Sequence, residues 1–324
     1  MRLGQGSTAR ATTRFRAMLA RGAHLGTALV LPGCYNALTA RILEHAGHEA
    51  IYMTGYGTSL SLLGLPDAGL ITLTEMAMNA RFIAGAITAP LIADADTGFG
   101  NAINVVRTVE EYIRAGVAGI HIEDQVAPKR CGHVAGREVI GREEAVAKIR
   151  AASETRRALD PDFTLIARTD ARGAHGGSLE EAITRANLFL EAGADLAFVE
   201  GPTSKAEIAE VCRQVKGPVF YNQTGISPRL SEAEMAELGI AVTILPGAVL
   251  RQTIMAVHDL AVAMKQQGAM AEAEVDARTK LHPLGNVHLF AGFDRIRALE
   301  EAFLPAAAQD KYAGTLGHMP EAKG

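Results

Sequence analysis

The stretch Ala118–Gly136, AGIHIEDQVAPKRCGHVAG, passes from a short apolar run directly into a charged loop. The run Gly119–Ile122 is short and mainly apolar, which predicts a buried strand. It ends at two adjacent acids, Glu123 and Asp124, and the cation-rich loop begins a few residues later. A buried strand that ends in acids at a polar loop is the pattern that recurs along this chain, and it indicates both the fold and the position of the chemistry.

The loop carries the pentapeptide Lys129–His133, KRCGH, in which cationic residues flank a single thiol. Because positive charge favours the thiolate, Cys131 is expected to ionise more easily than a free cysteine. Glycines at positions 132 and 136 would let the loop close over a site as a lid. On the loop alone, the alternative that Cys131 is a buried filler among solvated cations stays open.

Composition bounds the class of protein. The chain has 324 residues, of which 48% are hydrophobic and 21% charged, with a net charge of −4. This is an ordinary globular composition without the basic bias of a nucleic-acid-binding protein. No apolar run approaches the roughly 20 residues of a membrane span, and the N-terminus lacks the apolar core of a secretory signal. The three widely spaced cysteines predict free thiols and a cytoplasmic protein.

Short runs typical of strands recur along the chain. They are Ala28–Leu31, Ala50–Met53, Pro90–Ala93, Gly119–Ile122, Thr164–Ala167, Leu196–Val199, Val219–Tyr221 and Ala241–Ile244. Helix-like stretches alternate with them, among them Thr13–Arg21, Ala102–Ala115, Arg142–Ala158, Leu179–Ala192 and Ser231–Leu238. Several of these helices end at a glycine, which is a common C-cap: Gly116, Gly193 and Gly239.

Eight strand–helix alternations predict a parallel sheet closed into an α/β protein of the (β/α)₈ TIM-type barrel class. A doubly wound open sheet is the alternative, although no GxGxxG motif follows the first strand. We expect a flexible arm at 1–13, the barrel at 14–265, C-terminal helices at 266–305 and a tail at 306–324. The C-terminal helical stretches Arg251–Gln267, Ala271–Arg278 and Val287–Phe303 would cap the barrel or dock on another subunit.

Acidic residues follow several of the predicted strands. In such barrels the chemistry lies at the C-terminal ends of the strands. Asp94 and Asp96 end the third strand, two residues apart and therefore expected to face the same way, and Glu123 ends the fourth. A lone acid at a strand end is more often an N-cap for the next helix, and this alternative applies to Asp67 and Asp170. The three carboxylates together are harder to explain structurally.

Carboxylates without cysteine or histidine among them favour a hard divalent cation, Mg²⁺ or alternatively Mn²⁺. Such an ion would bind a 2-oxo or 2-hydroxy acid and act as a Lewis acid. Arg168 offers a planar fork for a substrate carboxylate, with a salt bridge to an acid such as Glu200 as the structural alternative. His121 lies inside a strand and is expected to be a packed, hydrogen-bonded core residue.

Three motifs together resemble the isocitrate lyase / phosphoenolpyruvate mutase superfamily: Asp94–Gly100 (DADTGFG), His121–Gln125 (HIEDQ) and Lys129–His133 (KRCGH). The resemblance covers roughly residues 14–265. The KRCGH pentapeptide is similar to that of the carbon–carbon lyase branch, which includes methylisocitrate and 2,3-dimethylmalate lyases. The resemblance implies a barrel whose eighth helix is swapped between subunits, usually in a homotetramer.

The resemblance also implies roles for single positions. Asp94 is similar to the direct Mg²⁺ ligand, and Asp67, Asp96 and Glu123 to outer ligands that act through water. The Thr54–Gly55 pair resembles one that grips the oxo-acid carboxylate through backbone N–H groups, and Cys131 resembles the catalytic acid/base. The other residues to which it gives catalytic or substrate-binding roles are Tyr52, Tyr56, Lys129, Arg130, Gly132, His133, Arg168, Glu200, Asn222 and Thr224.

The implied reaction is a retro-aldol, Claisen-type cleavage of a 2-hydroxy di- or tricarboxylate. It yields pyruvate or glyoxylate and a second carboxylate, which Cys131 protonates. Val134–Ile140 resembles the loop of the dimethylmalate and alkylmalate lyases, so a 2-alkylmalate is the favoured small-molecule substrate and methylisocitrate the next. Decarboxylation or hydrolysis of oxaloacetate at the same site is an alternative. A non-catalytic metabolite-binding barrel ranks last, because the acids and the thiol are all present.

Overall fold

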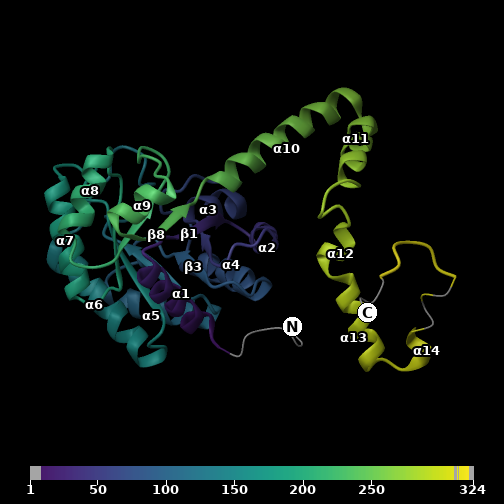
Figure 1. The fold of residues 1–324 in the computed structure, drawn as a ribbon, viewed down its shortest axis with the longest axis horizontal. Helices are drawn as coiled ribbons and strands as arrows, with labels where there is room; N and C mark the ends of the chain where they lie inside the picture. Colours follow the sequence, from purple (N-terminus) through teal and green to yellow (C-terminus); the bar gives the residue numbers. More distant parts are fainter. Residues whose placement is uncertain (1–8, 310–311, 313, 321–324) are drawn as a thin grey trace. The chain divides into compact units, whose positions relative to one another are not determined.

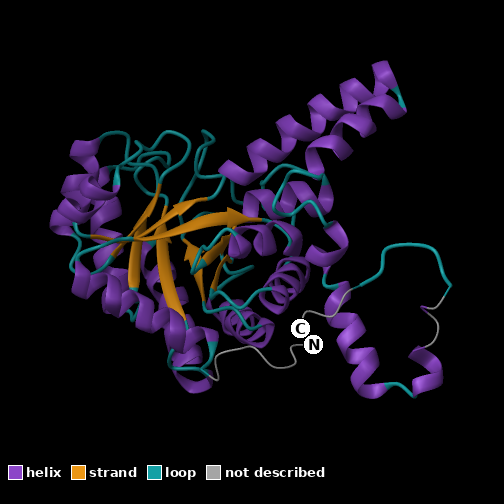
Figure 2. Ribbon diagram, turned by 45° about the vertical axis from the view of Figure 1, so that its right-hand side comes forward, coloured by secondary structure: helices purple, strands orange, loops and turns teal. Residues whose placement is uncertain are grey.

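The computed structural model describes residues 9–309, 312 and 314–320. Eight parallel strands form a closed barrel in which each strand pairs with the next, and β8 pairs back with β1 (Figures 1 and 2). The strands are β1 (Leu29–Cys34), β2 (Ile51–Met53), β3 (Leu91–Asp94), β4 (Gly119–Glu123), β5 (Thr164–Thr169), β6 (Leu196–Val199), β7 (Val219–Asn222) and β8 (Ile240–Leu245). The (β/α)₈ expectation is confirmed, and closure excludes the doubly wound alternative.

Helices precede, separate and follow the strands along the chain. They are α1 (Ala11–Leu25), α2 (Ala37–His45), α3 (Gly55–Leu63), α4 (Leu73–Ala86), α5 (Ala102–Ala115), α6 (Arg142–Leu159), α7 (Leu179–Glu191), α8 (Lys205–Gln214), α9 (Glu232–Leu238), α10 (Ala248–Gln267), α11 (Ala269–Thr279), α12 (Val287–Ala291), α13 (Phe293–Phe303) and α14 (Ala306–Gln309). The helical stretch expected at Val287–Phe303 is divided, because Gly292 adopts a left-handed conformation (φ 100°) that ends α12.

Local sequence signals account for the ends of the barrel helices. Gly116 and Gly239 adopt the left-handed conformation that ends α5 and α9, as their positions predicted. Hydroxyl and amide side chains cap the N-termini: Thr72 caps α4, Asn101 caps α5 and Ser178 caps α7. Neither Asp67 nor Asp170 is therefore an N-cap, so both acids need another explanation.

The barrel interior is filled by side chains. Leu31, Ile92, Ile166 and Phe198 point into one fully buried cluster, and Phe15 of α1 belongs to the same cluster. Arg16 of α1 binds Asp195 through two 2.8 Å hydrogen bonds, just before β6 begins. Helix α1 therefore covers the N-terminal ends of the strands, which leaves their C-terminal ends open for a site.

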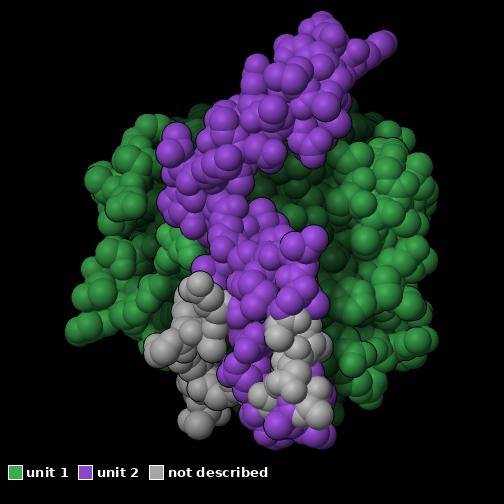
Figure 3. Space-filling view, turned by 90° about the vertical axis from the view of Figure 1, so that its right-hand side faces the viewer, with its two compact units in different colours: residues 1–253 green, residues 254–324 purple. Residues whose placement is uncertain are grey.

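The chain divides into two compact units, residues 1–253 and 254–324, coloured green and purple in Figure 3. The first contains the whole barrel, and the division falls within α10. The expected domain boundaries stay predictions. Of the expected arm, residues 1–8 lie outside the described residues and the positions from Ala11 on belong to α1; parts of the expected tail (310–311, 313 and 321–324) also lie outside. Within the described residues, no helix has the length and apolar character to cross a membrane.

Candidate active site

A cavity of about 370 Å³ opens at the C-terminal ends of the strands, and most of the residues given a role above line it. These are Tyr52, Thr54, Tyr56, Asp67, Asp94, Lys129, Cys131, Gly132, His133, Arg168, Glu200, Asn222 and Thr224. Gly55, Asp96 and Glu123 lie directly behind this lining and are buried. Arg130 is exposed and does not line the cavity; its main chain instead bonds the Gln125 side chain.

The acids of β3 meet through a tight turn. Asp94 ends the strand, and Asp96 follows in a left-handed conformation (φ 47°) that is uncommon for a residue with a side chain. The Asp96 N–H donates to Asp94 Oδ1 at 2.9 Å, and the Gly55 N–H donates to Asp94 Oδ2 at 3.1 Å. The two carboxylates do lie together, but the turn brings them together and not the alternation of an extended strand.

Gly55 lies so close to these acids that no side chain fits. A Cβ at this position would lie 2.5 Å from Asp94 Oδ2 and 3.3 Å from Asp96 Oδ1. The Gly55 N–H is engaged by Asp94, and the Thr54 N–H donates to the Cys34 carbonyl at 3.0 Å. In this structure neither N–H is free for a substrate carboxylate, so the carboxylate-gripping role expected for this pair stays a prediction.

Lys129 reaches from the loop into the acid cluster. Its Nζ lies 2.6 Å from Asp67 Oδ1 and 2.8 Å from Asp96 Oδ1, and the side chain is only 4% exposed. Burial raises the pKa of Asp96 to about 7, with Asp94 and Asp67 adding to the rise and Lys129 opposing it. Asp67, which is distant in sequence from the other acids, joins the site through this lysine.

Arg168 is the cation around which the remaining acids gather. Its Nε and Nη2 bind both oxygens of Asp170, at 2.8 and 3.0 Å, and Glu123 and Glu200 lie 3.3 and 3.4 Å from its guanidinium. Burial alone would raise the pKa of Asp170, but Arg168 and then Arg137 lower it below its usual value. The expected salt bridge to Glu200 exists, but Asp170 is the main partner.

The loop lies against the strand ends. A Cβ on Gly132 would lie 2.3 Å from Arg168 Nη2 and 2.7 Å from Glu200 Cγ, so only a glycine fits there. The His133 Nε2 lies 3.2 Å from Asn222 Nδ2, which also donates to Glu200 Oε2 at 3.0 Å. The Cys131 N–H donates to the Asp67 carbonyl at 3.2 Å. The thiol and the acids therefore line one cavity.

The expectation that nearby cations make Cys131 more acidic is wrong in sign. Burial raises the pKa of the thiol, and the lowering effects of the His133 backbone N–H, Arg168 and Lys129 are smaller. The physical reason is that withdrawal of the thiol from water disfavours the thiolate more than Arg168 and Lys129 favour it, and Arg130 is exposed. The thiol therefore keeps its proton near neutral pH, which suits a group that donates one.

His121 is a fully buried core residue, as its place in the strand predicted. Its Nε2 lies 2.8 Å from Tyr52 Oη, and Asp94 Oδ1 lies 3.5 Å away. Burial lowers the pKa of His121 to about 4, although Asp94 opposes this, so the ring is neutral at pH 7. It orients Tyr52 at the floor of the cavity.

The acid cluster fits a hard cation by its chemistry. Both carboxylate oxygens of Glu123 and Glu200 Oε1 are buried without a hydrogen-bond donor. All candidate ligands are oxygens, which Mg²⁺ and Mn²⁺ prefer. Among the described residues, however, no three Asp, Glu, His or Cys side chains stand close enough to bind a metal directly.

Sequence reasoning missed a supporting layer and one cation. Asp124 accepts hydrogen bonds from Thr169 Oγ1 (2.7 Å), the Asp170 N–H (2.9 Å) and Arg185 Nη1 (3.0 Å), which fixes the end of β5. The adjacent acids at positions 123 and 124 were a signal for this second role. Arg251, at the start of α10, lines the cavity, and the described residues place no acid against it.

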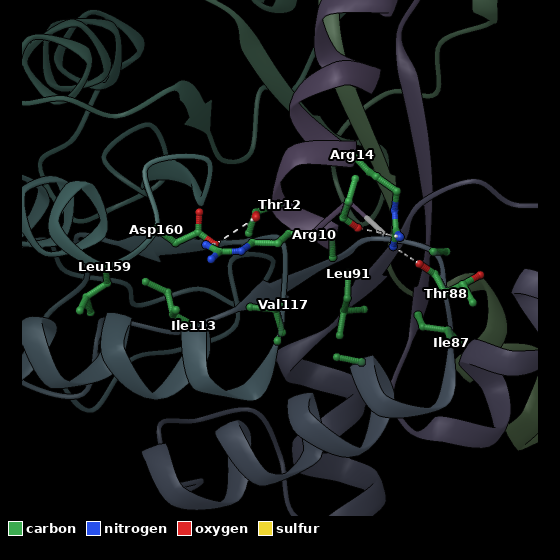
Figure 4. A pocket seen from close by; sticks show the side chains of 15 residues that line it. Arg10, Thr12, Arg14, Ile87, Thr88, Leu91, Ile113, Val117, Leu159 and Asp160 are labelled. Atoms are coloured by element: carbon green, nitrogen blue, oxygen red, sulfur yellow. Dashed lines mark hydrogen bonds and ion pairs between the residues drawn. The ribbon is translucent and has the colours of Figure 1, made fainter. Parts of the chain in front are cut away.

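A second hollow lies at the opposite, N-terminal ends of the strands, beside the start of α1 (Figure 4). There Arg14 donates to the Thr88 carbonyl, and Thr12 Oγ1 donates to Asp160 Oδ2 at 3.0 Å. Arg10 lies 3.8 Å from the same carboxylate. Because its cations already have partners and it lies away from the catalytic end of such barrels, we assign the chemistry to the first cavity.

Comparison with known proteins agrees with this assignment. A family model described as phosphoenolpyruvate phosphomutase matches residues 15–265. The chain is 43% identical to 2,3-dimethylmalate lyase of Eubacterium barkeri over 277 residues, covering 85% of this chain and 93% of the relative. It is 42% identical to 2-methylisocitrate lyase of Aeropyrum pernix, covering 80% and 83%.

Two solved structures extend the comparison. Oxaloacetate acetylhydrolase in complex with 3,3-difluorooxalacetate matches with a TM-score of 0.80 and 36% identity, covering 95% of this chain and 98% of the other. A phosphonopyruvate hydrolase complex with oxalate and Mg²⁺ matches with a TM-score of 0.80 and 32% identity, covering 92% and 100%.

Fold, site and comparisons together define an enzyme of the carbon–carbon lyase class on a (β/α)₈ barrel. The chain belongs to the isocitrate lyase / phosphoenolpyruvate mutase superfamily, which confirms the resemblance seen in its motifs.

The contact of Gly55 with the acids predicts a sharp effect of one methyl group. Gly55→Ala should displace Asp94 and lower kcat/KM at least 100-fold, because an error of about 1 Å at a reacting centre can cost that much. Gly85→Ala is the matched control: a Cβ there has nothing within 4 Å, so α4 should be unchanged or stabilised by roughly 0.5–1 kcal/mol. Steady-state kinetics and thermal unfolding measure both. Normal kinetics for Gly55→Ala would contradict the geometry.

Proposed function

We propose that this enzyme is a divalent-metal-dependent lyase that cleaves the C2–C3 bond of a 2-hydroxy dicarboxylate of the 2-alkylmalate type. The products are a 2-oxo acid and a monocarboxylate. The observation that carries the proposal is that the Cys131 thiol lines the same cavity as Asp94 and Arg168. The 43% identity to a 2,3-dimethylmalate lyase supports this class of substrate.

Asp94, with Asp67, Asp96 and Glu123 around it, would hold Mg²⁺ or Mn²⁺, which supplies a Lewis acid for charge on the substrate oxygens. The similar phosphonopyruvate hydrolase that binds oxalate and Mg²⁺ supports a metal of this kind.

The protein groups then have separate tasks. Arg168 donates to the substrate carboxylate, and the buried guanidinium favours negative charge there. The 2-hydroxyl group of the substrate gives up its proton to solvent, and its oxygen becomes the carbonyl oxygen of the 2-oxo acid as the C2–C3 bond breaks. The electron pair of that bond stays on C3 of the leaving carboxylate fragment. Cys131 protonates that carbon, since its raised pKa keeps the proton available. The loop packed on Arg168 through Gly132 excludes water from the carbanion.

Two other reactions remain candidates because specific observations favour them. Arg251 lines the cavity, where it would bind a third carboxylate. This supports methylisocitrate, a tricarboxylate, as the second candidate substrate. The structural similarity to oxaloacetate acetylhydrolase supports hydrolysis of oxaloacetate. Hydrolysis adds water to the C2 carbonyl before the C2–C3 bond breaks to oxalate and acetate. The C3 carbanion takes up a proton in this reaction too, so Cys131 would serve it in the same position.

The test is release of pyruvate or glyoxylate from a panel of 2-hydroxy di- and tricarboxylates, with oxaloacetate as a further substrate, in Mg²⁺. We expect the highest kcat/KM with a 2-alkylmalate and no turnover in excess EDTA, restored by added Mg²⁺ or Mn²⁺. Formation of oxalate and acetate from oxaloacetate with the highest kcat/KM would assign the hydrolase, and pyruvate with CO₂ from it a decarboxylase. A panel without any product would refute the lyase. Full activity in EDTA would remove the metal from the mechanism.

The role of Cys131 has its own test. Cys131→Ser should lower kcat by roughly 10²–10⁴, the usual loss when a general acid is removed. Cys212→Ser on α8 is the control, because that partly buried thiol lies outside the cavity. Both variants should keep the wild-type unfolding temperature within a few degrees. Unchanged turnover of the preferred substrate by Cys131→Ser would show that another group donates the proton.

We also propose a homotetramer in the cytoplasm. Helix α10 buries only Leu250, whereas Ile254, Met255, Val257, Val262 and Met264 are exposed. An apolar surface of this kind is typical of a protein–protein interface. The three cysteines are free, as in a reducing compartment. Sedimentation velocity of the full chain should give four times the chain mass of 34.2 kDa; a monomer would refute the assembly.

A further inference from the structure

The loop leaves the barrel at residues 124–126, carries the thiol at position 131 and comes back through residues 134–140, here called the returning arm. The returning arm is hydrogen-bonded to residues 124–126. Gln125 and Val139 form an antiparallel bridge, and the Val126 N–H donates to the Glu138 carbonyl at 2.9 Å. The Ile140 N–H donates to the Asp124 carbonyl at 2.9 Å. Because the two arms are joined in this way, a contact made by the returning arm restrains the segment that carries Cys131.

Arg137 lies on this returning arm and yet is buried, with only 5% of its surface exposed. Its guanidinium occupies a groove formed by two glycines. A Cβ on Gly173 would lie 1.9 Å from Arg137 Nη2, and one on Gly201 would lie 3.8 Å from Nη1. The Arg137 carbonyl accepts the His175 N–H at 2.9 Å. The loops after β5 and β6 therefore form a receptor shaped for this side chain.

At the end of the groove Arg137 meets the carboxylate that holds Arg168. Asp170 Oδ1 accepts from Arg137 Nη1 at 3.1 Å and from Arg168 Nη2 at 3.0 Å, while Oδ2 accepts from Arg168 Nε at 2.8 Å. The same Nη2 lies beneath Gly132 of the loop. Two guanidinium groups thus donate to one oxygen, Asp170 Oδ1. The Arg168 nitrogen that does so, Nη2, is also the one next to the loop.

Sharing has an electrostatic consequence. With Arg137 in place, part of the Asp170 charge is offset by the second cation, so Arg168 Nη2 is held less strongly and can donate to another anion. If Arg137 leaves with the loop, Asp170 has Arg168 alone as its cation in this network, apart from distant charges. Loop position and the availability of Arg168 are therefore linked through one carboxylate.

We propose that Arg137 is a positioning residue that holds the loop closed and, by sharing Asp170, leaves Arg168 Nη2 to the substrate carboxylate. The second half rests on the proposed function, since it assumes that Arg168 binds the substrate. The first half does not, because closure of the loop can be measured without turnover.

The first measurement is alkylation of the three cysteines by iodoacetamide in the native full-length protein, followed peptide by peptide by mass spectrometry. Arg137→Met should raise the alkylation rate of Cys131 about tenfold or more, while the rate of the buried Cys34 stays unchanged. Arg137→Lys keeps a cation near Asp170 and should restore the rate to within about threefold of the wild-type value. Arg142→Met, whose side chain pairs with Glu181 at the surface, is the control.

A second variant is designed to displace the Arg137 side chain from its groove while position 137 remains an arginine. Gly173→Ala would place its Cβ against Nη2 and should raise Cys131 alkylation as Arg137→Met does. Gly141→Ala, at the end of the same loop, has nothing within 4 Å of its Cβ and should behave as wild type. This pair keeps the proposal testable if Arg137→Met fails to fold.

Steady-state kinetics then test whether Arg137, by sharing Asp170, leaves Arg168 free to bind the substrate carboxylate. With the substrate that the wild type prefers, Arg137→Met should raise KM about tenfold and also lower kcat, with recovery of both in Arg137→Lys. An unchanged Cys131 alkylation rate in both test variants would overturn the proposal, and so would a parallel rise at Cys34, which would show only a loss of global stability. Exposed Cys131 with unchanged KM would retain the loop contact but overturn its effect on Arg168.

Discussion

The guanidinium of Arg168 is the interaction on which this site depends. It lies among Asp170, Glu123 and Glu200, all buried, and carboxylates taken out of water are costly unless a cation compensates them. Its place at the end of β5, with Glu123 opposite on β4 and Phe198 beneath its plane, holds the group in one orientation. The remaining polar groups are arranged around this fixed charge.

Lys129 compensates buried carboxylates on the other side of the cavity, as Arg168 does, but it belongs to a loop and not to a strand. Lys129 binds Asp67 and Asp96, so the acids that would surround a metal ion are partly compensated only while the loop lies against them. The thiol between the loop cations is nevertheless not acidic. The loop's positive charge is committed to carboxylates, and burial of Cys131 then determines its pKa.

The layer beneath these groups gives the site its rigidity. Asp124 ties β4 to the Thr169 hydroxyl, the Asp170 N–H and Arg185, and Asp170 in turn holds two arginines. A buried polar network stabilises a structure when its acceptors are satisfied, and both carboxylate oxygens of Asp124 and of Asp170 accept hydrogen bonds. Both oxygens of Glu123 and Glu200 Oε1 are buried without a hydrogen-bond donor, and the Oδ1 atoms of Asp67 and Asp96 have only the ion pair with Lys129.

The sequence by itself determined the barrel and predicted which side chains gather at the C-terminal ends of its strands. Hydrophobic runs marked all eight strands, glycines marked helix ends such as Gly116, and acids at strand ends marked the end of the barrel that holds the cavity, because these signals are local. The tertiary structure alone decided which charges pair. Asp170 was open to the interpretation of an N-cap, Arg137 had no assigned role, and the pKa of Cys131 shifts opposite to the expectation from its neighbours in sequence. The physical reason is that ion pairing and desolvation depend on which groups barrel closure brings together, such as Arg137 and Asp170 or Lys129 and Asp67, and the spacing of residues along the chain does not encode those distances.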